Sequence, residues 1–167
     1  MYIIIGASSF IGVYTVEEFL KQGCEVAVTG RNSKFKGHYD KLGVKYYNVD
    51  LAYAEDFAQL PTEGVEGVIL LGGLLPSNAE VNLDEEENAA DYFRINTIGT
   101  INVLEYCRKN GIKKVISNCS YADVRGAWGK HVITEDEPRD FIYTGDHAVY
   151  VLSLIHISEP TRLDVIS

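Results

Sequence analysis

The feature that most restricts the fold of this chain is a turn bounded by two glycines close to its amino terminus. An apolar run, Tyr2–Ile5, leads directly into Gly6, and Gly12 lies near the start of the amphipathic stretch Phe10–Gln22. A glycine at position 6 lets the chain turn sharply off a strand, and one at position 12 lets a helix pack closely on a sheet. The pattern predicts a strand, a tight turn and a helix as the first unit of an α/β fold.

Short apolar runs alternate with helical patterns along the rest of the chain. Runs rich in Val, Ile and Tyr predict five buried strands at Tyr2–Ile5, Glu25–Thr29, Val44–Tyr47, Val68–Leu71 and Lys114–Ser117. Helices are predicted over Phe10–Gln22, Ala52–Leu60 and Ala89–Asn110, with a further short helix between the second and third strands. Strands that alternate with helices indicate a parallel sheet covered on both faces.

Composition and charge exclude several classes of protein. A chain of 167 residues with 46% hydrophobic and 23% charged residues is typical of one globular domain. Its net charge of −9 disfavours a nucleic-acid partner. The three cysteines are widely spaced, so we expect reduced thiols and neither a disulfide framework nor a metal site. The opening apolar run is too short for a signal peptide or a membrane span, and we therefore expect a cytoplasmic protein with no membrane partner.

The glycine turn and the long helix resemble sequences of the extended short-chain dehydrogenase/reductase family of NAD(P)-dependent epimerases and dehydratases. The family carries GxxGxxG, often GATGFIG, where this chain reads GASSFIG from Gly6 to Gly12, and its NxxGTxNVLE helix resembles Asn96–Glu105. Ser9 replaces the middle glycine, a change that we expect the site to tolerate. The resemblance covers nearly all of residues 1–151 and implies a Rossmann-type doubly wound parallel sheet, truncated, with about five strands present.

The resemblance implies that NADP or NAD binds beside the glycine turn. The helix N-terminus there offers free N–H groups and a partial positive charge to a pyrophosphate. At the end of the second strand, Gly30 stands where an acidic residue would bind the ribose of NAD, and Arg31 and Lys34 suit a 2′-phosphate, which favours NADP. The alternative is that the two basic residues belong to a solvated turn. The predicted cofactor-binding residues are Gly6, Ser8, Ser9, Phe10, Ile11, Gly12, Arg31, Asp50, Leu51, Leu71, Gly72, Gly73 and Asn96.

Three stretches of that site are assigned by the resemblance. Asp50 and Leu51 border the adenine in the family, although Asp50 equally fits the N-cap of the following helix. Leu71–Gly73 matches loosely the small-residue stretch under the ribose and phosphates, and a simple loop start would give the same pattern. Asn96 would have a structural role against the loop after the catalytic strand, where the family's asparagine helps to hold backbone and water.

The family's chemistry requires a Ser or Thr, a Tyr, and a Lys four residues after that Tyr. The tyrosine is the general acid/base, the lysine lowers its pKa, and the hydroxyl residue orients the substrate oxygen. Ser120 and Tyr150 are the predicted catalytic residues, from stretches that resemble VxxSSxxVYG and YxxSK. Tyr121 competes with Ser120 in an alternative register, and Tyr143 competes with Tyr150. Position 154, where the lysine is required, holds Leu154.

The carboxyl-terminal residues resemble a translated sequencing-library adaptor. Leu152–Arg162 reads LSLIHISEPTR, which one frame of a transposase-type adaptor encodes, and Ile166-Ser167 matches the adaptor's continuation after an index. We therefore expect an NAD(P)-binding Rossmann domain at residues 1–151, incomplete at its carboxyl end, and a non-native tail at residues 152–167. Under this hypothesis Ser153 carries no function, and only Tyr150 remains of the YxxSK pattern.

The predicted function belongs to a longer parent enzyme. The resemblance implies an NAD(P)-dependent epimerase, dehydratase or reductase that transfers hydride at a hydroxyl or keto carbon of a sugar-nucleotide-like small molecule. The family often dimerises, so a homodimeric parent is expected, whereas the chain itself should show little or no turnover. The alternative is a non-catalytic NADP-binding module, such as a redox sensor or assembly factor, on the same fold. A flavodoxin-type protein fits less well because it leaves the glycine turn and the NxxGTxN helix unexplained.

Overall fold

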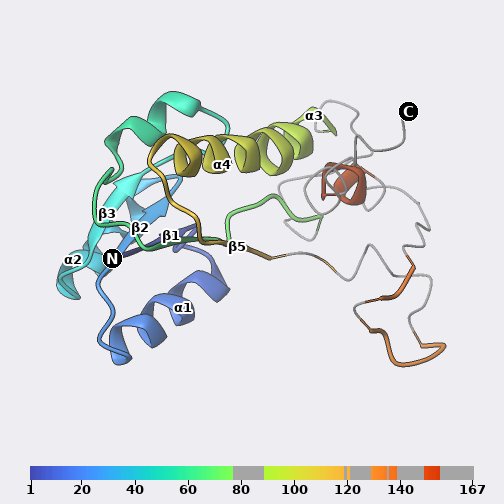
Figure 1. The fold of residues 1–167 in the computed structure, drawn as a ribbon, viewed down its shortest axis with the longest axis horizontal. Helices are drawn as coiled ribbons and strands as arrows, with labels where there is room; N and C mark the ends of the chain where they lie inside the picture. The colour runs from blue at the N-terminus through green and yellow to red at the C-terminus, as the bar shows by residue number, and fades with distance from the viewer. Residues whose placement is uncertain (77–88, 119, 121–128, 135, 139–148, 155–167) are drawn as a thin grey trace. The chain divides into compact units, whose positions relative to one another are not determined.

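The computed structural model describes residues 1–76, 89–118, 120, 129–134, 136–138 and 149–154, which belong to two compact units. The first unit comprises Met1–Gly73 and Ile98–Asn118, and the second comprises Leu74–Thr97 and Cys119–Ser167. The sheet belongs to the first unit (Figure 1).

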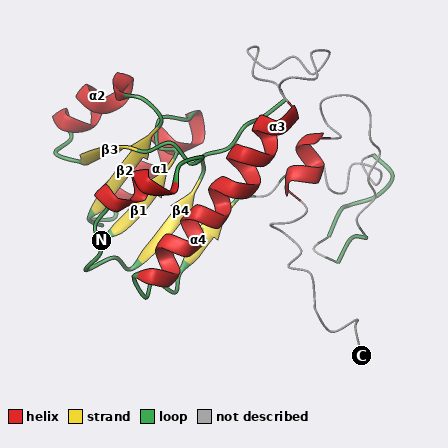
Figure 2. Ribbon diagram, turned by 90° about the horizontal axis from the view of Figure 1, so that it is seen from above, coloured by secondary structure: helices red, strands yellow, loops and turns green. Residues whose placement is uncertain are grey.

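The first unit is built on a five-stranded parallel sheet in the order β3-β2-β1-β4-β5 (Figure 2). In its central strand, Ile4 pairs with Val28 on one side and with Ile69 on the other. The strand order reverses between β1 and β4, and in doubly wound sheets such a switch point opens a ligand-binding crevice. The predicted Rossmann-type class is thereby confirmed. The strands are β1 (Tyr2–Ile5), β2 (Val26–Gly30), β3 (Lys45–Asn48), β4 (Gly67–Leu70) and β5 (Val115–Ser117).

Helices cover both faces of this sheet. Figure 1 shows α1 below the strands and α4 above them. Every residue of β2 and β4 is buried, as expected for parallel strands covered on both sides. Each such Val or Ile contributes about 1.5–3 kcal/mol through burial. The helical elements of the first unit are α1 (Phe10–Lys21), η1 (Ser33–Phe35), α2 (Lys36–Lys41), η2 (Ala54–Gln59) and α4 (Gly99–Lys109).

Two predicted helices differ from the structure. The helix predicted over Ala52–Leu60 is only the 3-10 segment η2, because its N-terminus lacks a side-chain cap and Pro61 stops its extension. The long helix predicted over Ala89–Asn110 is divided into α3 (Ala89–Tyr92), the π-helical segment η4 (Phe93–Ile98) and α4. Single π-helical turns within helices occur frequently at functional sites.

The described part of the second unit contains a small apolar cluster. Tyr92 and Tyr150 pack edge to face with their ring centroids 6.2 Å apart. Leu74 and Val151 complete the buried part of the cluster. Residues 149–154 form a helix, so the cluster joins three separate stretches of the chain.

None of the described helices combines the length and the apolar character that crossing a bilayer requires.

Candidate nucleotide-binding site

The turn after β1 packs directly against the turn after β4. Gly6 has a φ of +83°, which L residues rarely adopt. A Cβ on Gly6 would overlap the backbone nitrogen of Gly72 and lie 2.6 Å from the Gly72 Cα. A Cβ on Gly72 would in turn lie 3.0 Å from Cδ1 of Leu51. The two turns therefore meet backbone to backbone at the switch point, which explains Gly6, whereas a side chain on Gly72 would crowd Leu51.

Ser9 is the N-cap of α1. Its backbone is extended, with φ −78° and ψ 164°, and its Oγ accepts a hydrogen bond of 3.0 Å from the Gly12 N–H. Because this φ is negative, the backbone conformation does not require a glycine here, and the serine is accommodated without strain. The N–H groups of Phe10 and Ile11 have no acceptor within the described residues and lie at the positive end of the helix. They can therefore donate to an anionic ligand.

Tyr39 supports the glycine turn from α2. Its side chain is 0% exposed, and its hydroxyl donates a hydrogen bond of 2.6 Å to the carbonyl oxygen of Ala7. Burial raises the pKa of Tyr39 to about 12, so the hydroxyl stays protonated near neutral pH. The sequence did not predict this role of Tyr39, because the pattern of a short helix does not indicate which distant turn the helix contacts.

Arg31 and Lys34 lie in an exposed turn directly after β2. The turn is ordered by Asn32, whose Oδ1 accepts a hydrogen bond of 3.1 Å from the Lys34 N–H. In the part of the chain that the structure describes, neither basic side chain forms an ion pair. Two cationic groups are thus available at the carboxyl end of β2, beside Gly30.

Asp50 orders the turn that precedes η2. Its Oδ1 accepts a hydrogen bond of 3.0 Å from the Ala52 N–H, and its backbone N–H donates to Oδ2 of Asp56 at 2.8 Å. The N-cap role that the sequence allowed for Asp50 is not found, because η2 begins after Tyr53 and its N-terminus has no side-chain cap; the Asp50 carboxylate orders the turn before η2 instead. Since a carboxylate has several acceptor sites, this hydrogen bond leaves Asp50 able to accept from an adenine amine as well.

The NxxGTxN pattern of the long helix is explained in large part by Leu51. A Cβ on Gly99 would lie 2.8 Å from the Cβ of Leu51, so the glycine allows the helix to pack closely there. Asn102 donates from Nδ2 to the Leu51 carbonyl oxygen at 2.8 Å. Leu51 is held between Gly99 on one side and Gly72 on the other. This arrangement fixes the segment predicted to border the adenine.

Asn96 is buried in the second unit and is fully engaged in hydrogen bonds. Its Oδ1 accepts from the Leu74 N–H at 2.7 Å, and its Nδ2 donates to the Leu74 carbonyl oxygen at 3.1 Å and to Oγ of Ser153 at 2.9 Å. Asn96 therefore ties the segment after β4 to the helix 149–154. Most of the loop after β5, which the sequence suggested as its partner, lies outside the described residues.

The two predicted catalytic residues both belong to the second unit. Ser120 is half-buried and irregular in backbone conformation. Tyr150 is buried, and its carbonyl oxygen accepts a hydrogen bond of 2.6 Å from Oγ of Ser153. The competing candidates Tyr121 and Tyr143 lie outside the described residues.

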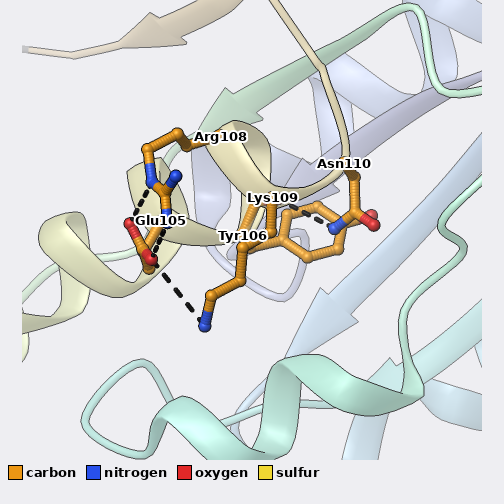
Figure 3. Close-up of polar contacts among 5 residues, drawn as sticks. All are labelled: Glu105, Tyr106, Arg108, Lys109 and Asn110. Carbon is orange, nitrogen blue, oxygen red and sulfur yellow. Dashed lines mark hydrogen bonds and ion pairs between the residues drawn. The ribbon is translucent and has the colours of Figure 1, made fainter.

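A separate surface cavity of about 280 Å³ lies between η2 and the last turns of α4. Figure 3 shows the helix side of this region, where Glu105 pairs with Arg108 at 2.6 Å and with Lys109 at 3.8 Å. The hydrogen bond from Arg108 lowers the pKa of Glu105. The carboxylate is thus neutralised by its own helix, and none of the residues predicted for the cofactor site lines this cavity.

A parallel sheet with a glycine turn at its switch point is the architecture of a Rossmann-type nucleotide-binding protein. The chain belongs to the NAD dependent epimerase/dehydratase family, whose family model matches residues 2–138.

The chain is also similar to individual proteins, in sequence or in fold. The chain is 31% identical over 117 residues to a human sterol-4-alpha-carboxylate 3-dehydrogenase (decarboxylating), a match that covers 70% of this chain and 28% of the relative. Its fold is similar to that of the UDP-Glc/GlcNAc 4-epimerase of Campylobacter jejuni, with a TM-score of 0.72, 21% identity and coverage of 95% and 50% of the two chains. A UDP-glucose 4-epimerase of Thermus thermophilus in complex with NAD gives a TM-score of 0.72, 24% identity and coverage of 95% and 51%. The chain thus spans under a third of the sterol dehydrogenase and about half of each epimerase.

Proposed function

We propose that this chain is the cofactor-binding part of a longer NAD(P)-dependent enzyme that acts at a hydroxyl or keto carbon of a sugar-nucleotide-like substrate. The observation that carries the proposal is the backbone contact between Gly6 and Gly72, which places the uncapped N–H groups of α1 at the switch point of the sheet. A side chain on Gly6 would push the two turns apart and one on Gly72 would crowd Leu51, so either would disturb the surface that a pyrophosphate approaches. The two epimerases of similar fold act on UDP-sugars by their names.

Different residues of the chain would bind different parts of the cofactor. The N–H groups of Phe10 and Ile11 bind the pyrophosphate, Asp50 and Leu51 border the adenine, and Leu71–Gly73 lies under the ribose and phosphates. The bound cofactor supplies the hydride donor or acceptor. In the parent, Tyr150 holds and returns the proton of the substrate hydroxyl, and Ser120 orients the substrate oxygen. Asn96 holds the segment after β4 through its two hydrogen bonds to Leu74.

We further propose that the site prefers NADP to NAD. Gly30 provides no carboxylate for the ribose hydroxyls, whereas Arg31 and Lys34 provide positive charge for a 2′-phosphate. Isothermal titration of the purified chain with both cofactors tests this. We expect NADP to bind about tenfold or more tightly, which corresponds to one charge-assisted hydrogen bond of about 1.5–3 kcal/mol. Equal affinities would remove the preference and leave the cofactor site in place.

Residues 152–167 are proposed to be a non-native tail, so that the natural sequence departs from this one after Val151. Sequencing the source gene through that codon decides the matter. A lysine codon at position 154, followed by a further open reading frame, would support Tyr150 as the acid/base of a full enzyme. If Leu154 and the remaining tail are genomic codons, the non-catalytic NADP-binding module becomes the better interpretation. The chain itself is expected to show little or no turnover, because it has no lysine at that position.

The parent enzyme is proposed to be a cytoplasmic homodimer. Support for the dimer comes from α4 and the residue before it, where Ile98, Ile101 and Leu104 are 45%, 53% and 49% exposed and recur at a spacing of three. Residues at this spacing share one face of a helix, and an apolar face of this kind suits packing against a second helix. Light scattering of the full-length parent at several concentrations tests the dimer, and Leu104→Glu is expected to shift it toward monomer.

The human relative supports a second candidate substrate. Its name describes a dehydrogenase acting on the 3-position of a sterol carboxylate, and its 31% identity exceeds that of the two UDP-sugar epimerases. Assays of the parent with a UDP-hexose and with a 3-hydroxysterol 4α-carboxylate, each with NADP and NAD, distinguish the two substrate classes.

A further inference from the structure

Gly30, the last residue of β2, has no space for a side chain. A Cβ at this position would overlap the hydroxyl of Tyr46 and lie 3.0 Å both from its Cζ and from Oγ of Ser8. Gly30 does not have a positive φ, so a side chain is excluded by crowding rather than by backbone conformation. An acidic residue here, which would bind the ribose of NAD, is thus excluded by a tyrosine of the neighbouring strand.

Tyr46 also holds the turn that follows Gly30. Its hydroxyl donates a hydrogen bond of 2.5 Å to the carbonyl oxygen of Asn32, the residue directly after Arg31. Its ring stacks on Tyr39, with centroids 5.8 Å apart and planes inclined by 19°. Tyr46 is 9% exposed, and burial raises its pKa, so the hydroxyl remains a donor near neutral pH. The turn that carries Arg31 and Lys34 is therefore fixed to the buried pair of Tyr39 and Tyr46.

Ser8 brings a second hydroxyl to the same place. It belongs to the glycine turn, and within the described residues its Oγ has no hydrogen-bond partner. The carboxyl end of β2 is therefore bordered by two neutral hydroxyl groups and followed by an exposed guanidinium.

We propose that Tyr46 is a positioning residue that sets the choice between NADP and NAD, because it occupies the place of the ribose-binding carboxylate and fixes the turn that presents Arg31 to a 2′-phosphate. Ser8 contributes a neutral hydroxyl to the same ribose subsite. The inference rests on the proposed cofactor function. It differs from a purely structural role for Tyr46, which would affect both cofactors equally.

The test is a calorimetric titration of the 167-residue chain with NADP and NAD, and with adenosine 2′,5′-bisphosphate and AMP as probes that need no nicotinamide site. Tyr46→Phe is expected to weaken NADP and the bisphosphate about five- to tenfold, as for the loss of one hydrogen bond, and to change NAD and AMP less than about twofold. Tyr47→Phe is the matched control. Tyr47 is the next residue of β3, also buried, and by strand alternation its side chain lies on the other face of the sheet. Tyr47→Phe should therefore leave the affinities for all four ligands unchanged.

A second measurement needs no cofactor. Gly30→Ala should lower the Tm by about 3–10 °C because its Cβ meets the Tyr46 hydroxyl, and the double variant with Tyr46→Phe should recover part of that loss. Equal weakening of all four ligands by Tyr46→Phe would overturn the inference while the cofactor site stands. An unchanged Tm in Gly30→Ala would overturn the exclusion of a side chain by Tyr46. A wild-type chain that binds none of the four ligands would overturn the proposed function itself.

Discussion

The hydroxyl of Tyr39 and the carbonyl oxygen of Ala7 form a buried hydrogen bond of 2.6 Å that joins α2 to the glycine turn. Both residues are 0% exposed, so no water can replace the tyrosine as a donor. The conformation of the glycine turn thus depends on the Tyr39 side chain, which belongs to a helix that follows β2 in the chain. The stacked ring of Tyr46 extends the same support to the end of β2.

Replacement of Tyr39 by Phe should destabilise the chain by about 1–3 kcal/mol, because the Ala7 carbonyl is left buried without a donor. Urea unfolding followed by circular dichroism measures this. Tyr14→Phe is the control, since Tyr14 is 60% exposed and its loss should change stability by less than about 0.5 kcal/mol. Equal effects of the two substitutions would contradict the importance of the Ala7 bond.

The stability of the chain should fall in alkaline solution. Burial raises the pKa values of Tyr39 and Tyr106 to about 12, so the folded state disfavours both phenolates. A tyrosine in the unfolded chain titrates near about 10, and the stabilisation is therefore complete below that pH and is lost as the pH rises toward about 12. Urea midpoints measured across this range should decline. The decline should be shallower in Tyr39→Phe, and an identical slope would argue against its contribution.

Gly6→Ala should be much more damaging than Gly23→Ala. Both glycines have a positive φ, +83° and +73°, but a Cβ on Gly23 meets no atom within 4 Å, whereas one on Gly6 overlaps the Gly72 backbone. We expect a loss of about 1 kcal/mol for Gly23→Ala from the backbone alone. The crowding at Gly6 should add about 1–3 kcal/mol to that value. Thermal unfolding of the two variants gives the comparison, and similar Tm values would show that the two turns do not meet.

Ser9→Ala should cost about 1 kcal/mol through loss of the N-cap of α1, and Ser9→Gly should cost only a few tenths. The same pair of variants tests the site. Ser9→Gly releases the Gly12 N–H from its side-chain acceptor and restores the family's glycine, so its cofactor affinity should equal or exceed that of the natural serine. A clear loss of affinity in Ser9→Gly would show that the serine hydroxyl itself contacts the ligand.

The sheet could be predicted from the sequence because parallel strands buried on both faces appear as uninterrupted apolar runs. The predicted bounds of β1 agree with the structure, and those of the other strands differ by one residue at one or both ends. The one-residue difference in bounds is most important at β2, because Gly30 belongs to the strand and does not follow it. The π-helical segment was not predicted, because the apolar pattern of residues 89–110 indicates one continuous helix.

The candidate site was predictable where one short stretch contains the whole signal, as in the glycine turn. The side chains that hold this turn in place could not be predicted. Tyr39 and Tyr46 act through backbone carbonyl groups of distant residues, and a carbonyl acceptor leaves no trace in the sequence. For the same reason the partner of Asn102, the Leu51 carbonyl, could not be predicted.

The contact between Gly6 and Gly72 also constrains the order of events when the chain folds. It joins two turns that lie far apart in the sequence, so it forms only after β4 has closed a long loop onto β1. During synthesis the first strand, turn and helix leave the ribosome well before Gly72 does. A nascent chain therefore cannot complete the surface proposed to bind the pyrophosphate until β4 has emerged.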